Sequence, residues 1–288
     1  MRGGFDGLIL DMDGVLLDTV PSFTACVVQT ARACSEPPGL GGDWSEAEVE
    51  RLRLSGGFNN DWDGAAAMAL LGPASGPGDG WARQCAALRA SCGGPGAVVS
   101  LVGAGRWDAM RAKAEPAFQR LYAGPRSLEL YGLAPTEPAG LCERERPLAT
   151  PSDLSGFGLP VGIFTGRTWK ETELGMERLG LRLPPGRIVC DTEARFRKPR
   201  PDGLLALAKA LCARHPLYVG DTVDDLAAAL NARDAGLDVA FAGVAQEGSE
   251  RALRFARGGA VLVRASLRQI LGDLAMERPL SSEAVEEG

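Results

Sequence analysis

Residues 7–15 read Gly-Leu-Ile-Leu-Asp-Met-Asp-Gly-Val, a short apolar run that ends in two acids and a glycine. A continuous apolar run of this length predicts a strand buried in a parallel sheet. Similar runs recur at 160–165, 187–190, 216–220, 238–243 and 260–263. Helical patterns separate them at about 170–180, 202–213, 224–234, 248–257 and 266–275. This alternation predicts an α/β fold, a Rossmann-like parallel sheet with helices on both faces.

A different pattern fills residues 19–150, where helical periodicity recurs and no clear strand is present. Gly/Pro-rich stretches at 72–80 and 93–105 predict loops between these helices. We call residues 19–150 the helical module. We expect it to be inserted after the first strand of a catalytic core formed by 1–18 and 151–276. The polar residues 277–288 predict a flexible acidic tail.

Composition excludes several classes of protein. The chain has 288 residues, 45% of them hydrophobic, with 31 Lys+Arg against 37 Asp+Glu, a net charge of −6. This acidic balance argues against a nucleic-acid binder and against an anionic membrane surface as partner. The single histidine, His215, excludes a metal site built on several histidines. No stretch has the roughly 20 apolar residues of a membrane span.

The seven cysteines are odd in number and form no CxxC pair. That usage predicts free thiols in a reducing compartment rather than a disulfide framework. The acids around the short apolar run at 8–10 do not fit a secretory signal. We therefore expect a cytoplasmic protein.

Asp11 and Asp13 stand two residues apart at the end of the first predicted strand. Two carboxylates this close repel each other, so they need a cation or a shared proton. An aspartate can also act as a nucleophile and form an aspartyl-phosphate. Gly14 permits a sharp turn beside them. The alternative is an acidic turn without function.

Polar residues also follow two later strands. Thr165-Gly166 could hold phosphate oxygens, although a threonine there could equally cap the next helix. Asp221 follows the strand at 216–220, where a metal ligand would lie, whereas Asp224 and Asp225 could simply cap a helix.

Lys198, in the Arg-rich stretch 195–200, could neutralise phosphate charge or lie in a solvated basic loop. Taken singly each of these signals is modest, but they occur in order at the strand ends of one predicted domain.

These motifs together resemble the haloacid dehalogenase-like hydrolases, specifically phosphatases with a helical cap after the first strand, such as phosphoglycolate phosphatases. The resemblance covers roughly 5–18 and 155–275. The matching stretches are Asp11-Met-Asp-Gly-Val15, Thr165-Gly166, Lys198-Pro199 and Gly220-Asp221 through Asp225.

The resemblance implies a role for each catalytic residue. Asp11 would be the nucleophile that takes the phosphoryl group. Asp13 would act as general acid for the leaving alcohol and then as base for water. Thr165 and the amide of Gly166 would bind phosphoryl oxygens, and Lys198 would neutralise Asp11 and the phosphate.

The resemblance also implies a Mg²⁺ cofactor. The Asp11 side chain, the Asp13 backbone carbonyl and Asp221 would hold the ion, since hard oxygen ligands suit it. Asp225 occupies the last acidic position of the metal site, where it would orient water or Lys198. The sequence assigns no role to Asp224.

Within the helical module, residues 55–62 mix glycines, polar side chains and two aromatics. Asn59 and Asn60 could reach the site and bind substrate, as could Arg167. The alternative is an interhelical turn with Asp61 as N-cap, and Arg167 could equally pair with an acid.

The five tryptophans are read as core packing, with a homodimer through the module as the alternative to a monomer. The expected partner is a small phosphorylated metabolite. Two further functions stay open: a phosphomutase on the same core, and a non-catalytic regulatory protein that binds a phosphorylated ligand.

Overall fold

The structure is a computed structural model that describes residues 4–36 and 44–277. Its core is a six-stranded parallel sheet with the order β5-β4-β1-β6-β7-β8. The strands are β1 (Gly7–Leu10), β4 (Val161–Phe164), β5 (Ile188–Val189), β6 (Pro216–Gly220), β7 (Ala240–Val244) and β8 (Leu262–Arg264). All six predicted strands occur, and the α/β prediction is confirmed. Apart from Glu277, the predicted tail lies outside the described residues.

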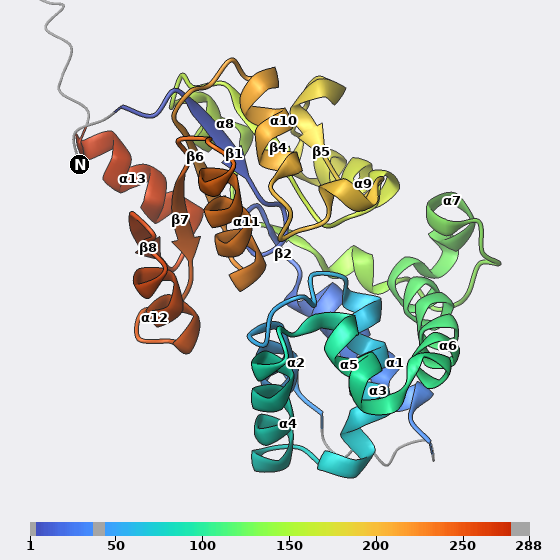
Figure 1. Cartoon of the computed structure of the whole chain (residues 1–288). Helices are drawn as coiled ribbons and strands as arrows, with labels where there is room; N and C mark the ends of the chain where they lie inside the picture. The colour runs from blue at the N-terminus through green and yellow to red at the C-terminus, as the bar shows by residue number, and fades with distance from the viewer. Residues whose placement is uncertain (1–3, 37–43, 278–288) are drawn as a thin grey trace, which may run out of the picture.

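Helices cover both faces of the sheet (Figure 1). Successive strand side chains point to opposite faces, so Leu8 and Leu10 of β1 pack on one side and Ile9 on the other. The first side is covered by α8 (Pro151–Ser155), α9 (Trp169–Leu179) and α13 (Leu267–Glu277). The second is covered by α10 (Asp202–Ala210), α11 (Val223–Asp234) and α12 (Glu250–Arg257). Two apolar layers therefore cover the two faces of the sheet, and the carboxyl ends of its strands remain available for a functional site.

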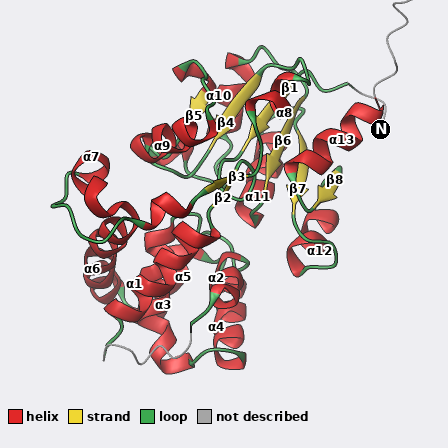
Figure 2. Cartoon of the chain, turned by 180° about the vertical axis from the view of Figure 1, so that it is seen from behind, coloured by secondary structure: helices red, strands yellow, loops and turns green. Residues whose placement is uncertain are grey.

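The helical module packs around a hydrophobic cluster of its own, beside the sheet (Figure 2). A π-helical turn (Val20–Thr24) leads into α1 (Ala25–Cys34). The other helices are α2 (Glu46–Arg53), α3 (Asp61–Ser75), α4 (Asp79–Ala90), α5 (Gly94–Val102), α6 (Ala104–Ala123) and α7 (Ser127–Tyr131). A two-stranded antiparallel ribbon of β2 (Leu17–Asp18) and β3 (Arg146–Pro147) joins the module to the core.

The prediction of a loop at 93–105 is wrong, because most of this stretch forms helix α5. Gly93 and Gly94 adopt positive φ and turn the chain, and Pro95 then stands near the N-terminus of the helix, where its missing N–H costs nothing. Ala97 and Val98 are buried in the cluster of the module. Tertiary packing therefore turns a glycine-rich segment into a helix.

Trp44, Trp81 and Trp107 are buried inside the helical module, and the first two pack edge to face at 5.2 Å between ring centroids. This arrangement supports the core-packing interpretation of these tryptophans. Among the described residues, no single helix is long and apolar enough to cross a membrane. The helices α4 and α5 have that length and composition only when taken together, and they meet at 109°.

Candidate active site

Four sequence motifs meet at the carboxyl ends of the central strands. Asp11 follows β1, Thr165 follows β4 and Asp221 follows β6, and β1 lies between the other two strands. This edge of an open parallel sheet is where ligands bind in α/β folds. The topology therefore brings together residues that are more than 200 positions apart in the chain, as the predicted convergence requires.

Lys198 lies at the centre of this group. Its ammonium Nζ is 2.8 Å from Oδ1 of Asp11 and 2.7 Å from Oδ1 of Asp225, and its side chain is fully buried. Burial alone would lower the pKa of Lys198, but the two carboxylates outweigh it and raise the pKa. The lysine is thus held as a cation, which excludes the solvated-loop alternative.

The negative charge of the carboxylates around Asp11 exceeds the positive charge of the nearby Lys198. Burial raises its pKa, as do Asp225, Asp221 and Asp13, and Lys198 opposes them; the net pKa is well above the ordinary value. Burial likewise raises the pKa of Asp221 to about 6, against the opposing charge of Arg251. The cluster therefore favours binding of a further cation.

Carboxylate oxygens of Asp11, Asp221 and Asp225 lie within 4.8 Å of one another. A hard divalent cation such as Mg²⁺ takes oxygen ligands of this kind, so the residues fit the predicted metal. Asp225, however, is already engaged. Its Oδ2 accepts hydrogen bonds from the Thr222 hydroxyl at 2.7 Å and from the amides of Thr222 and Asp221 at 2.9 and 3.2 Å. Asp11 and Asp221 are left as the freer side-chain ligands.

Gly14 has a φ of +69°, and a Cβ at this position would lie 2.2 Å from Oδ2 of Asp221. Only glycine therefore lets the turn after Asp13 approach the fourth motif. This close approach packs the β1 motif directly against the β6 motif.

Thr165 is buried, and its hydroxyl accepts a hydrogen bond from the amide of Arg167 at 3.2 Å. The N-cap of α9 is Thr168, which forms a capping box with Glu171. Thr165 is therefore not the cap of this helix, and it stays beside the site together with Gly166. At the fourth motif, by contrast, Asp225 does take part in a capping box, with Thr222.

The segment 55–62 reaches the site, and one detail of its interpretation was wrong. The N-cap of α3 is Asn60, whose side chain accepts from the amide of Asp63 at 3.1 Å. Asp61, which the alternative interpretation of this segment made the N-cap, pairs instead with Arg53 at 2.7 Å. Asn59 packs closely on Gly166: a Cβ at position 166 would lie 2.3 Å from Nδ2 of the Asn59 side chain. The structure thus brings both asparagines toward the strand ends.

A small cavity of about 70 Å³ lies between core and module. Its lining includes Asp11, Asp13 and Gly166 from the core and Phe58, Asn59 and Trp62 from the module. The indole N–H of Trp62 is buried without a hydrogen-bond partner among the described residues. At this volume the cavity holds a few water molecules, and it is smaller than the roughly 300–1,000 Å³ of drug-sized ligand sites.

Asp224, which the sequence left without a role, ties the module to the core. Its Oδ1 and Oδ2 accept from the amide of Gly57 at 2.9 and 3.1 Å. Burial raises the pKa of Asp224 to about 6. No sequence signal links positions 57 and 224.

Arg251 adds a second tie, since it pairs with Glu50 of α2 and, at 3.0 Å, with Oδ2 of Asp221. Sequence reasoning missed this arginine as well. Its partners lie 201 and 30 positions away, so only the fold reveals the contact.

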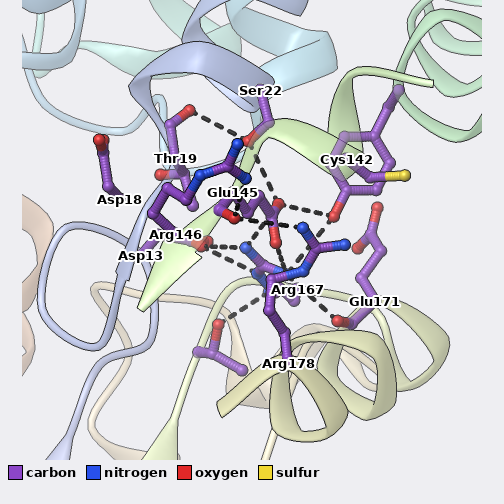
Figure 3. A network of polar contacts seen from close by, with 12 residues as sticks. Asp13, Asp18, Thr19, Ser22, Cys142, Glu145, Arg146, Arg167, Glu171 and Arg178 are labelled. Atoms are coloured by element: carbon purple, nitrogen blue, oxygen red, sulfur yellow. Dashed lines mark hydrogen bonds and ion pairs between the residues drawn. The ribbon is translucent and has the colours of Figure 1, made fainter. Parts of the chain in front are cut away.

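Arg167 is buried and contacts Asp13, at 2.6 Å from Nη2 to Oδ1, and Glu145, at 3.0 Å from Nη2 to Oε1 (Figure 3). Pairing with an acid was one of its two predicted roles. Glu145, on the segment that returns from the module, was not expected at the site.

Known proteins agree with this architecture. Residues 5–233 match the haloacid dehalogenase-like hydrolase family. A phosphatase from Thermococcus thioreducens superposes with a TM-score of 0.59 at 24% identity, covering 88% of this chain and 99% of that one. A hydrolase from Pseudomonas syringae gives 0.57 at 18% identity, covering 95% and 100%. These structures share the fold.

A curated relative, an imidazoleglycerol-phosphate dehydratase of Phytophthora nicotianae, is 27% identical over 236 residues. Those residues are 79% of this chain but 42% of the relative, so the chain spans less than half the length of this protein. The family match extends over most of the chain and includes the motifs at Asp11, Thr165, Lys198 and Asp221. The protein therefore belongs to the haloacid dehalogenase-like hydrolases.

Proposed function

We propose that the protein is a magnesium-dependent phosphatase that hydrolyses a small phosphate monoester through an aspartyl-phosphate on Asp11. The observation that carries this proposal is the contact of Lys198 with Asp11 at 2.8 Å, since Asp11 lines a cavity together with Asp13 and Asp221. A nucleophilic carboxylate, a fixed cation and a second acid are what phosphoryl transfer requires.

In the proposed mechanism, Asp11 attacks phosphorus through a carboxylate oxygen, and the bond to the leaving oxygen breaks. Asp13 gives that oxygen its proton and later removes a proton from the water that cleaves the acyl phosphate. The hydroxyl of Thr165 and the amide of Gly166 bind phosphoryl oxygens, and Lys198 offsets their charge.

Mg²⁺ would be held by the side chains of Asp11 and Asp221 and the backbone carbonyl of Asp13, and it would neutralise charge on the transferring group. Asp225 would keep Lys198 and the loop after β6 in place. This division of roles follows the hydrogen bonds that already occupy Asp225.

We further propose that residues 19–150 act as a lid over a core made of 1–18 and 151–276. Residues of both parts line the cavity of about 70 Å³, and closure of such a lid excludes bulk water. Asn59, Asn60 and Trp62 are the module residues that would contact the leaving group.

The test is hydrolysis of a panel of phosphorylated metabolites and of 4-nitrophenyl phosphate with Mg²⁺. We expect release of inorganic phosphate that a chelator abolishes. Asp11→Asn should lower kcat by at least about 1000-fold, because the nucleophile is lost. Transfer of the phosphoryl group to another position of the substrate, without free phosphate, would indicate a mutase. Full turnover in chelator, or an active Asp11→Asn enzyme, would overturn the mechanism.

A further inference from the structure

We propose that Arg167 is a positioning residue that holds Asp13 in the orientation needed for proton transfer. This inference rests on the proposed function, in which Asp13 is the general acid. It also assigns Arg167 a purpose other than direct binding of substrate.

Arg167 donates two hydrogen bonds to a single carboxylate oxygen of Asp13. Nε and Nη2 of Arg167 lie 2.8 and 2.6 Å from Oδ1 of Asp13. In the described part of the chain, no other side chain bonds to this carboxylate, so Oδ2 has no side-chain partner, and Asp13 lines the cavity. Two donors on Oδ1 fix the rotamer of Asp13 and decide which oxygen can exchange a proton with a ligand.

Arg167 is itself held in place by hydrogen bonds to further acceptors (Figure 3). Its Nη2 and Nη1 donate to Oε1 and Oε2 of Glu145 at 3.0 and 3.3 Å, and Nη1 also donates to the backbone oxygen of Glu171 at 3.2 Å. Every nitrogen of the guanidinium therefore faces a protein acceptor, and its five N–H donors are used. A substrate anion would have to displace one of these partners.

Glu145 connects Arg167 to side chains of the helical module. Its side chain is fully buried, and Oε1 also accepts from the hydroxyls of Tyr122 at 2.9 Å and Ser22 at 3.2 Å. Ser22 and Tyr122 belong to the helical module, whereas Asp13 and Arg167 belong to the core. The orientation of Asp13 therefore depends on how the module is seated.

The charges of this group support the same interpretation. Burial would lower the pKa of the Arg167 guanidinium, but Asp13, Tyr122 and Glu145 outweigh it and raise the pKa. The arginine is a permanent cation between two acids, one at the cavity and one enclosed. A buried carboxylate such as Glu145 needs a cationic partner of this kind.

The test uses aryl phosphates whose leaving groups differ in acidity: phenyl, 4-nitrophenyl and 2,4-dinitrophenyl phosphate. The value of kcat/KM reports formation of the aspartyl-phosphate, where the acid protonates the leaving oxygen. Phenoxide needs that proton, and the acidic dinitrophenol leaves without it.

For Arg167→Lys, and for the charge-balanced double variant Arg167→Met with Glu145→Gln, we expect a selective loss. The kcat/KM for phenyl phosphate should fall about 100-fold, a typical share of general acid catalysis. That for 2,4-dinitrophenyl phosphate should fall less than about 5-fold, since only proton transfer is impaired. The double variant leaves no unpaired buried charge, which protects folding.

Asp13→Asn provides the benchmark, because it should show the same selective loss. Arg178→Met is the matched control: this arginine contacts the backbone oxygen of Glu145 at 3.2 Å and Glu143 at 3.3 Å. We expect it to leave the order of the three substrates unchanged.

Equal losses on all three substrates in the Arg167 variants, or a raised KM with unchanged kcat, would overturn the positioning role while Asp13→Asn kept its selective loss. A wild-type protein without phosphatase activity would instead refute the proposed function. A uniform loss in Asp13→Asn would remove the acid role of Asp13 and the positioning role with it.

Discussion

At the scale of single residues, the site depends on a buried cation shared by two acids. Lys198 contacts Asp11 and Asp225 within 2.8 Å on both sides. We therefore expect the ammonium group to contribute to both stability and catalysis, and the two contributions can be separated by experiment.

We predict that Lys198→Met lowers the free energy of unfolding at neutral pH by about 3–5 kcal/mol, because it leaves two buried carboxylates without a cation. Phosphatase activity should fall at least about 100-fold. Urea unfolding in chelator measures the first effect and steady-state kinetics the second.

Adding Asp225→Asn to Lys198→Met should recover part of the stability but none of the activity. The control is Lys209→Met, since Lys209 is exposed on α10. Unchanged stability of Lys198→Met would mean that water reaches the pair.

At the scale of elements, the segment before α3 is held to the start of α11 by Asp224 and the amide of Gly57. Burial raises the pKa of Asp224 to about 6, above the roughly 3.9 of an unfolded chain. Between these values the folded protein keeps a proton that the unfolded chain has released. The ionised carboxylate therefore reduces stability progressively as the pH rises through this range.

We therefore predict that Asp224→Asn raises the free energy of unfolding at neutral pH by about 2 kcal/mol and changes it by less than about 0.5 kcal/mol near pH 4. Asparagine keeps an acceptor for the amide of Gly57. Urea unfolding in chelator at both pH values measures the difference.

The matched control is Asp202→Asn in the first turn of α10, whose side chain is 40% exposed. It should change stability by less than about 0.5 kcal/mol at either pH. A less stable Asp224→Asn protein at neutral pH would show that the negative charge itself holds the loop.

Features set by interactions between neighbouring residues could be predicted from the sequence, whereas contacts between distant residues could not. Buried strands and their acidic ends could be predicted because hydrophobic runs and turn residues are local. Helix α5 could not, because the packing of Ala97 and Val98 outweighs the glycines that begin it. Asp224 and Arg251 were missed for a related reason: their partners lie 167 and 201 positions away.

At the scale of the whole molecule, we expect the acidic cluster to make stability depend on a bound cation. Mg²⁺ at about 100 times its dissociation constant should stabilise the folded protein by about 2.7 kcal/mol. We predict a rise in Tm of several degrees for a chain of this length. Calorimetry with Mg²⁺, and with Na⁺ at equal ionic strength, measures it.

Asp221→Asn should abolish this rise, because it removes one side-chain ligand. In chelator the same variant should be more stable than the wild type at neutral pH, since the raised pKa of Asp221, about 6, marks a carboxylate whose charge is unfavourable. An equal rise in Tm in both proteins would place the stabilising ion elsewhere.

The ribbon of β2 and β3 has a consequence for how such a protein can diversify. Asp18 and Arg146 face each other across the ribbon, so the polypeptide departs from the sheet and comes back at adjoining points. Helices between those two residues can be lengthened, shortened or replaced without altering the gap that the core must bridge, as long as Ser22, Tyr122 and Glu145 keep their contacts. We expect such replacements to change ligand preference while the residues at the strand ends are retained.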